Sequence, residues 1–285
     1  MTATLFDKAH PDTYMLPTAI LFDLDDTLFD HRRASALALG AMHAAYAPDL
    51  PFDTFATVHA DVLEDFHTRF LAGEFTLDGA RVARMQTLFS RFDRALDTDT
   101  AERAAHLYRE QHQANRRLVA GAAELLDALH GHCRLGIVTN NSTVEQLEKL
   151  RALDIARYFD VVVISEDVGV TKPDPRIFSI ALERIGARAQ EAVFIGDNWT
   201  NDIIGACNAG MAAIWLDRDG ETQALEGLSG HKCPERRSHA GVSSHRIAAI
   251  SSLAPAAQVV ATIKTTFTHR TPGAKQHEQL EPLAT

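Results

Sequence analysis

Residues 19–27 read AILFDLDDT, a short apolar run that passes directly into three aspartates and a threonine. So short an apolar run is typical of a strand buried on both faces of a parallel sheet. Further short apolar runs follow at 135–138, 161–164, 193–195, 212–216 and 247–250. Helical patterns lie between them, at 143–152, 175–185 and 201–209. The sequence therefore predicts an α/β fold, with a parallel sheet and helices on both of its faces.

A long segment with a helical pattern separates the first apolar run from the second. Apolar residues recur there at helical spacing over 34–46, 55–70, 80–96 and 101–118. Because the segment leaves the first strand at its carboxyl end, where ligands bind in such sheets, we expect it to act as a lid. The expected organisation is a catalytic core of 17–30 and 119–262, a helical cap of 31–118 and a polar C-terminal tail of 263–285.

Composition and charge narrow the classes of function. Hydrophobic residues make up 46% of the chain and charged residues 23%, which is ordinary for a globular protein. The net charge of −10 repels phosphate backbones and anionic lipids, so we expect neither a nucleic-acid polymer nor a membrane as a partner. Three widely separated cysteines and the lack of a leader or a long apolar run favour a cytoplasmic protein. No pattern indicates an oligomeric state.

Three carboxylates, Asp23, Asp25 and Asp26, follow the first predicted strand within four positions. Negative charge concentrated at the ligand end of a sheet is unfavourable unless a cation or a proton compensates it. A hard cation such as Mg²⁺ is the natural compensator, because it prefers carboxylate oxygens. Taken alone, the same residues also fit a solvated loop.

Polar residues also follow the other predicted strands. Thr139 and Asn140 end the second, at a helix N-terminus suited to anions or to simple capping by a side chain. Lys172 follows the third strand, and Asp197 and Asp202 follow the fourth. Each has an ordinary structural explanation by itself, as a cap or a surface charge. Together they are the parts needed to move a phosphoryl group with a carboxylate nucleophile.

In order and spacing these motifs resemble those of the haloacid dehalogenase-like hydrolase superfamily. The resemblance covers about residues 17–216 and implies a Rossmann-like core with an inserted helical cap. It implies that Asp23 is the nucleophile that forms an aspartyl-phosphate. It also implies that Asp25 protonates the leaving oxygen and then deprotonates water, so we expect neighbouring carboxylates to raise the pKa of Asp25.

The resemblance also implies a set of binding residues. Mg²⁺ would be held by the side chains of Asp23 and Asp197 and by the backbone carbonyl of Asp25. Asp202 would assist through water or by orienting Lys172. The phosphate-binding residues would be Thr139, Asn140 through its N–H, and Lys172.

Several functions stay open within this resemblance. The stretches at 163–173 and 202–211 look most like bacterial pyrimidine 5′-nucleotidases, which favours a nucleoside monophosphate as the small phosphorylated substrate. The alternatives are a phosphosugar or phosphoglycolate phosphatase, a phosphomutase and a non-catalytic sensor of a phosphorylated ligand. A dehalogenase is disfavoured because halide leaves without a proton, so Asp25 would have no purpose.

Two further groups of residues have no clear place in this scheme. Arg32-Arg33 and Arg116-Arg117 flank the insertion and are interpreted as solvated charge rather than as substrate contacts. The segment 220–244 reads as a long loop. His231, Cys233, His239 and His245 lie in or beside it, but their spacing matches no usual zinc pattern.

Overall fold

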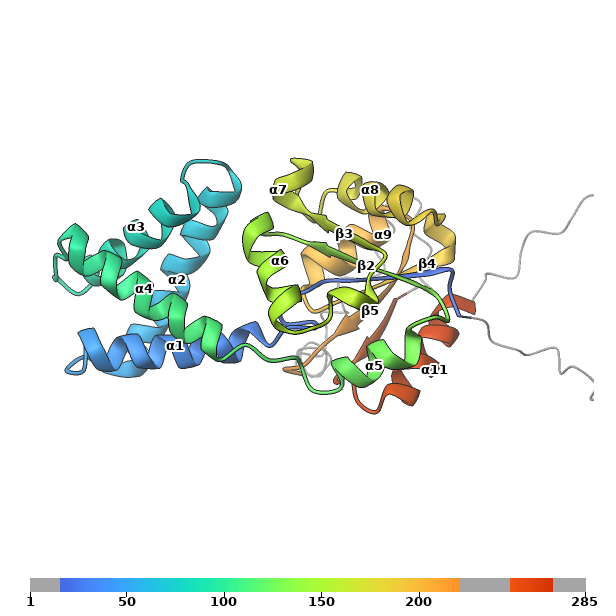
Figure 1. The fold of residues 1–285 in the computed structure, drawn as a ribbon, viewed down its shortest axis with the longest axis horizontal. Helices are drawn as coiled ribbons and strands as arrows, with labels where there is room; N and C mark the ends of the chain where they lie inside the picture. Colours follow the sequence, from blue (N-terminus) through green and yellow to red (C-terminus); the bar gives the residue numbers. More distant parts are fainter. Residues whose placement is uncertain (1–15, 221–246, 269–285) are drawn as a thin grey trace, which may run out of the picture.

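The computed structural model describes residues 16–220 and 247–268, and its core is a single sheet of six parallel strands (Figure 1). The strands are β1 (Ala19–Phe22), β2 (Arg134–Thr139), β3 (Val161–Ile164), β4 (Ala192–Gly196), β5 (Ala212–Leu216) and β6 (Ile247–Ile250). Their order in the sheet is β3-β2-β1-β4-β5-β6. The predicted α/β class is thus confirmed.

Strand β1 lies in the interior of the sheet, between β2 and β4. The loops that follow these two strands therefore lie beside the loop that follows β1. Phe22 is in register with Ile137 of β2 on one side and with Ile195 of β4 on the other. All three strands are parallel, so their carboxyl ends meet at one edge of the sheet. The aspartates that follow β1 therefore lie beside the residues that follow β2 and β4.

The side chains of β1 alternate between two hydrophobic clusters, as expected of a strand that is covered on both faces. Ile20 and Phe22 pack in the cluster under α5 (Ala122–Leu129), α6 (Thr143–Ala152) and α11 (Ala256–Thr268). Ala19 and Leu21 pack in the cluster under α8 (Pro175–Ile185), η3 (Trp199–Ile204) and α9 (Gly205–Asn208). Shorter elements complete the core: η1 (Ala156–Tyr158), α7 (Ser165–Val168) and η2 (Ala189–Glu191).

Four helices between β1 and α5 form a separate bundle beside the ligand end of the sheet (Figure 1). They are α1 (His31–Tyr46), α2 (Phe52–Leu71), α3 (Leu77–Ser90) and α4 (Thr98–Ala114). This bundle, called the cap below, has its own buried cluster, which includes Met42, Phe55 and Phe89. It meets the core at α6, where Arg81 of α3 pairs with Glu145, and Arg116, which follows α4, pairs with Glu148 at 3.1 Å.

Three boundaries predicted from the sequence are wrong. The predicted helix 80–96 ends at Ser90 in α3, because Asp93 takes a left-handed φ of 56° that a helix cannot contain. The predicted helix 101–118 ends at Ala114 in α4. The predicted start of the tail at 263 falls inside α11, which continues to Thr268.

Some predictions from the sequence lie outside the described residues. They include most of the segment 220–244 and the four candidate zinc ligands, His231, Cys233, His239 and His245. Within 16–220 and 247–268, none of the helices combines the length and the apolar composition that crossing a bilayer requires.

The cap contains a buried histidine that makes its stability depend on pH. His59 of α2 packs against the ring of Tyr108 with centroids 5.3 Å apart, and its Nε2 has no hydrogen-bond partner in the structure. Burial, together with the charge of Arg84, lowers the pKa of His59 from 6.5 to about 3. Between those two values the unfolded chain binds a proton that the folded chain does not, so stability rises with pH in this window.

We therefore expect the free energy of unfolding to fall steadily as the pH is lowered from about 6.5 towards 3. A His59→Phe variant should show a shallower pH dependence. Urea unfolding at a series of pH values measures it, with the exposed His106→Phe in α4 as the control. An unchanged pH dependence in His59→Phe would show that another group is responsible.

Candidate active site

A cavity of about 360 Å³ lies between the cap and the carboxyl ends of the strands. A volume of this size suits a small-molecule ligand. All the site residues predicted from the sequence line this cavity: Asp23, Asp25, Thr139, Asn140, Lys172, Asp197 and Asp202. The structure thus brings together residues that are up to 179 positions apart in the chain, between Asp23 and Asp202. Their chemical roles stay predictions.

Lys172 links two of the predicted carboxylates at the floor of the cavity. Its Nζ donates to Asp23 Oδ1 at 2.6 Å and to Asp202 Oδ1 at 2.6 Å, and all three side chains are buried. Burial lowers the pKa of Lys172, but the two carboxylates outweigh it and raise that pKa above its usual value. The ammonium is therefore a permanent positive charge beside the predicted nucleophile.

The loop that carries Lys172 is fixed to the loop that follows β2. The side chain of Asn140 accepts from Lys172 N at 2.8 Å and donates to Lys172 O at 2.9 Å. These two hydrogen bonds hold the backbone of Lys172 beside Asn140 in the way that a neighbouring strand would. They therefore fix the position from which the Lys172 side chain extends. The structure thus gives the Asn140 side chain a positioning role, besides the phosphate contact predicted for its N–H.

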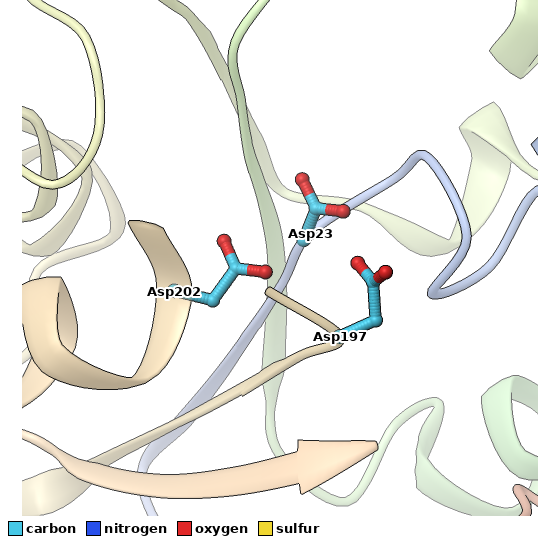
Figure 2. Close-up of side chains that lie close together, drawn as sticks. All are labelled: Asp23, Asp197 and Asp202. Carbon is cyan, nitrogen blue, oxygen red and sulfur yellow. The ribbon is translucent and has the colours of Figure 1, made fainter. Parts of the chain in front are cut away.

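Asp23, Asp197 and Asp202 offer carboxylate oxygens that lie within 4.8 Å of one another, as Figure 2 shows. Burial and the neighbouring carboxylates Asp202 and Asp26 raise the pKa of Asp197 to about 7, against the opposing charge of Arg32. Burial also raises the pKa of Asp23, with Lys172 opposing it and the nearby aspartates adding to it. This crowding of negative charge is what a bound cation relieves.

The donor set therefore fits a hard divalent cation, because it consists of carboxylate oxygens and contains no thiolate or imidazole. Asp202 is the most constrained of the three, since its Oδ1 accepts from Lys172 and its Oδ2 accepts from Asn198 N at 2.9 Å. The glycine at 196 makes room for it, because a Cβ there would overlap the Asp202 carboxylate.

The electrostatic environment of Asp25 is the opposite of the one predicted. Its Oδ1 and Oδ2 accept from Lys149 Nζ at 2.7 and 2.9 Å, and Oδ2 also accepts from Gln146 Nε2 at 3.1 Å. Burial by itself would raise the pKa of Asp25, but the charge of Lys149 and the hydrogen bonds from Lys149 and Gln146 lower it below its usual range. The expectation of a raised pKa is wrong because it counted the neighbouring aspartates and overlooked this lysine.

Gln146 and Lys149 are site residues that the sequence reasoning missed. Gln146 also donates to Thr139 Oγ1 at 2.6 Å, so it connects Asp25 with a predicted phosphate-binding residue. Both side chains are almost fully buried on α6, at 0% and 3% exposure. The sequence does offer one indication of them. Gln146 and Lys149 are three positions apart, so they lie on the same face of α6, and this face also buries the apolar Leu150.

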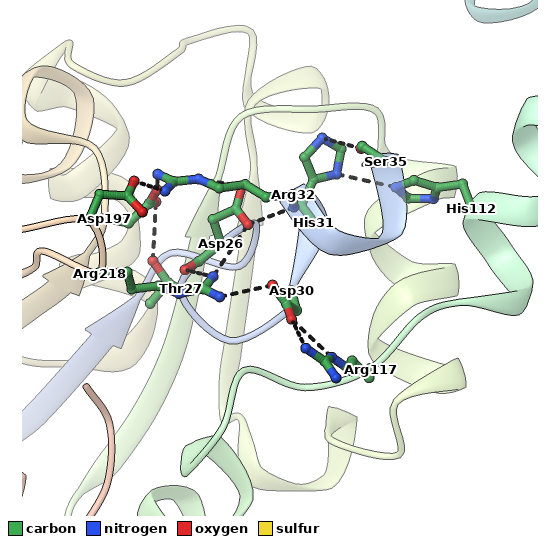
Figure 3. A network of polar contacts seen from close by, with 11 residues as sticks. Asp26, Thr27, Asp30, His31, Arg32, Ser35, His112, Arg117, Asp197 and Arg218 are labelled. Atoms are coloured by element: carbon green, nitrogen blue, oxygen red, sulfur yellow. Dashed lines mark hydrogen bonds and ion pairs between the residues drawn. The ribbon is translucent and has the colours of Figure 1, made fainter. Parts of the chain in front are cut away.

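Ion pairs form around the two chain segments that connect the core to the cap, as Figure 3 shows. Arg32 lies 3.3 Å from Asp197 and 3.6 Å from Asp26, and Arg117 lies 2.7 Å from Asp30. The side chains of Arg32 and Arg117 stay about half exposed, so they are solvated charges that also form ion pairs. The interpretation as solvated charge is wrong for Arg116, whose side chain is buried and pairs with Glu148.

Comparison with known proteins agrees with this geometry. The family model of the haloacid dehalogenase-like hydrolases matches residues 17–210. A glyceraldehyde 3-phosphate phosphatase of Pyrococcus abyssi is 35% identical over 200 residues, which span 69% of this chain and 80% of that protein. The pyrimidine 5′-nucleotidase YjjG of Escherichia coli is 43% identical over 98 residues, 34% of this chain and 44% of that one.

The fold agrees as well. The crystal structure of the putative HAD-hydrolase YfnB from Bacillus subtilis, bound to magnesium, superimposes with a TM-score of 0.66 at 25% identity. The match covers 86% of this chain and 99% of that one. The family and the enzyme class predicted from the sequence are therefore confirmed: the chain belongs to the haloacid dehalogenase-like hydrolases.

Proposed function

We propose that the chain is a Mg²⁺-dependent phosphatase that hydrolyses small phosphomonoesters through an aspartyl-phosphate on Asp23. The observation that carries this proposal is the position of Asp23. Its carboxylate lines the cavity between the cap and the core, is held by Lys172 and lies among the carboxylates of a candidate cation site. A nucleophile, a fixed positive charge and a cation site at one point are what phosphoryl transfer to a carboxylate requires.

In the first step the Asp23 carboxylate attacks phosphorus, a bond to phosphorus forms and the bond to the alkoxide oxygen breaks. Lys172 holds Asp23 Oδ1, which fixes the orientation of the nucleophile, and Lys172 and Thr139 bind the phosphate oxygens. A bound Mg²⁺ would supply positive charge that offsets the repulsion between the carboxylate and the phosphate. Asp23, Asp197 and the Asp25 carbonyl would hold it, with Asp202 assisting.

Asp25 acts on protons in both steps. It gives a proton to the departing alkoxide, and it then takes one from the water that attacks the aspartyl-phosphate and releases inorganic phosphate. Lys149 and Gln146 stabilise the ionised carboxylate, so the arrangement in the structure corresponds to the second step, in which Asp25 is the base.

Two substrate classes are supported by relatives. The nucleotidase match favours a nucleoside monophosphate, as the sequence suggests, but it spans 44% of that relative. The match to the glyceraldehyde 3-phosphate phosphatase spans 80% of its length, which favours a sugar phosphate as the second candidate. A panel of both classes, assayed for released phosphate, separates them, and conversion without phosphate release would identify a phosphomutase instead.

Removing the metal should abolish turnover. We expect EDTA to stop hydrolysis of p-nitrophenyl phosphate and Mg²⁺ to restore it. An Asp197→Asn variant should need at least about tenfold more Mg²⁺ for half-maximal rate, since it loses one charged ligand. Asp99→Asn in the cap is the matched control, because it makes the same change at an exposed site. Full activity in EDTA would exclude the metal-dependent mechanism, and an absence of turnover under all conditions would favour a sensor.

A further inference from the structure

The cap side of the cavity carries an arginine that packs against an aromatic ring but has no ion-pair partner among the described residues. Arg84 of α3 lines the cavity and is partly buried, with its guanidinium carbon 5.1 Å from the centre of the Tyr108 ring. Its Nε is buried and has no hydrogen-bond partner. Within the described residues, Arg84 forms no ion pair and no hydrogen bond. Leaving a guanidinium in such a place is unfavourable unless something else binds it.

Two other arginines on the same wall are already paired with carboxylates. Arg81 pairs with Glu145 and Asp78, and Arg116 pairs with Glu148. Arg84 lies on the same helix as Arg81, one turn further along, but no described carboxylate lies within ion-pair distance of it. Its positive charge is therefore available to a ligand in the cavity.

The histidines on this wall do not supply comparable charge. Burial lowers the pKa of His31, His67 and His112, in the last case to about 3, so they are neutral near pH 7. Apolar side chains, such as Leu63 and Phe70, also line this part of the cavity. The cap side also carries Glu64 and Arg109, but Arg109 is solvent-exposed, so Arg84 is a partly buried guanidinium without an ion pair, opposite a floor where Lys172 serves the reacting phosphate.

We propose that Arg84 binds a second anionic group of the substrate, so that the enzyme selects phosphomonoesters that carry a carboxylate or a second phosphate away from the reacting phosphate. Both groups accept paired hydrogen bonds from a planar guanidinium. This inference rests on the proposed phosphatase function and narrows its substrate class. The inference therefore disfavours ordinary nucleoside monophosphates and monophosphorylated neutral sugars, which lack such a group. It favours phosphomonoesters of acids and sugar phosphates that carry a second phosphate.

The test compares substrates that differ in this group alone. The carboxylate pairs are phosphoglycolate against ethylene glycol phosphate, and 6-phosphogluconate against sorbitol 6-phosphate. The second-phosphate pair is fructose 1,6-bisphosphate against fructose 6-phosphate. We expect the wild-type kcat/KM to be at least about tenfold higher for the anionic member of one pair, which is the effect of one charged hydrogen bond. The pair that responds identifies the group.

Variants then assign the preference to Arg84. Arg84→Gln should lower the anionic-to-neutral ratio of kcat/KM by about 10- to 100-fold, and Arg84→Lys should retain part of it. Arg91→Gln is the matched control, since it removes the same charge at the exposed end of α3, outside the cavity, and should leave the ratio unchanged.

The outcomes separate this inference from the proposed function. Hydrolysis of p-nitrophenyl phosphate without a preference in any pair would overturn the assignment of Arg84 and leave the phosphatase intact. An equal loss for both members of a pair in Arg84→Gln would show a structural role and also overturn it. If the variant does not fold, the wild-type preference and Arg84→Lys decide. No turnover of any phosphomonoester with Mg²⁺ would overturn both.

Discussion

An Asp23→Asn variant should lose turnover by a factor on the order of 10⁴ or more, since an amide cannot form the acyl phosphate. The substitution keeps the size of the side chain. It removes the negative charge that Lys172 binds at 2.6 Å, so some loss of stability accompanies it. Released phosphate measures the activity, and thermal unfolding followed by circular dichroism shows whether the fold is retained.

The matched control for Asp23→Asn is Asp30→Asn. Asp30 is also a buried carboxylate, with 3% exposure, and it also binds cations, Arg117 and Arg218. It does not line the cavity. We expect Asp30→Asn to lower stability while chemistry continues.

A second readout follows the intermediate itself. Rapidly quenched wild-type enzyme should gain the mass of one phosphoryl group on Asp23, since the carboxylate stays esterified until water attacks phosphorus. This gain in mass should not occur in Asp23→Asn. A folded Asp23→Asn variant with near wild-type activity would refute the covalent mechanism.

An Asp25→Asn variant should show a loss that depends on the leaving group. For alkyl phosphates we expect kcat to fall by about 10²- to 10⁴-fold, because the alkoxide needs a proton to depart. For p-nitrophenyl phosphate the loss in the first step should be much smaller, since this leaving group is stable as an anion. Steady-state and burst kinetics on both substrates measure the difference.

Burst kinetics also separate the two roles of Asp25. If Asp25 is the base of the second step, p-nitrophenyl phosphate should give a burst of nitrophenol in the variant, followed by slow turnover. Lys149→Met is the companion variant, since Lys149 binds both oxygens of Asp25. Equal losses for both substrates in Asp25→Asn, with no burst, would remove the acid and base roles from this residue.

Much of the fold and the site could be predicted because the relevant information is local. The strand that precedes Asp23 is buried on both faces, so its short apolar run is visible in the sequence. In a parallel sheet, residues that follow different strands gather at one edge, which places Thr139, Lys172 and Asp197 near Asp23 without further information.

What the sequence could not give depends on packing between distant elements. Lys149 looks like an ordinary helix surface residue until α6 is docked against the loop that follows β1, where it becomes 3% exposed beside Asp25. The same holds for Arg84, whose lack of an ion-pair partner among the described residues becomes visible only when α3 and α4 are placed over the core. The lowered pKa of Asp25 cannot be predicted from the sequence for the same reason. It depends on which charged side chains lie near the carboxylate in space.

The docking of the cap on α6 has a consequence for how new specificities can arise in this enzyme. Glu145 and Glu148, which anchor the cap, stand within one helical turn of Gln146 and Lys149, which hold the proton-transfer group. Mutations that shift the cap relative to the core, so that a different substrate fits, also disturb α6, whose side chains bind Asp25. Substitutions at cavity-lining positions of α2, α3 and α4 that do not contact α6 can therefore change substrate specificity without disturbing Asp25.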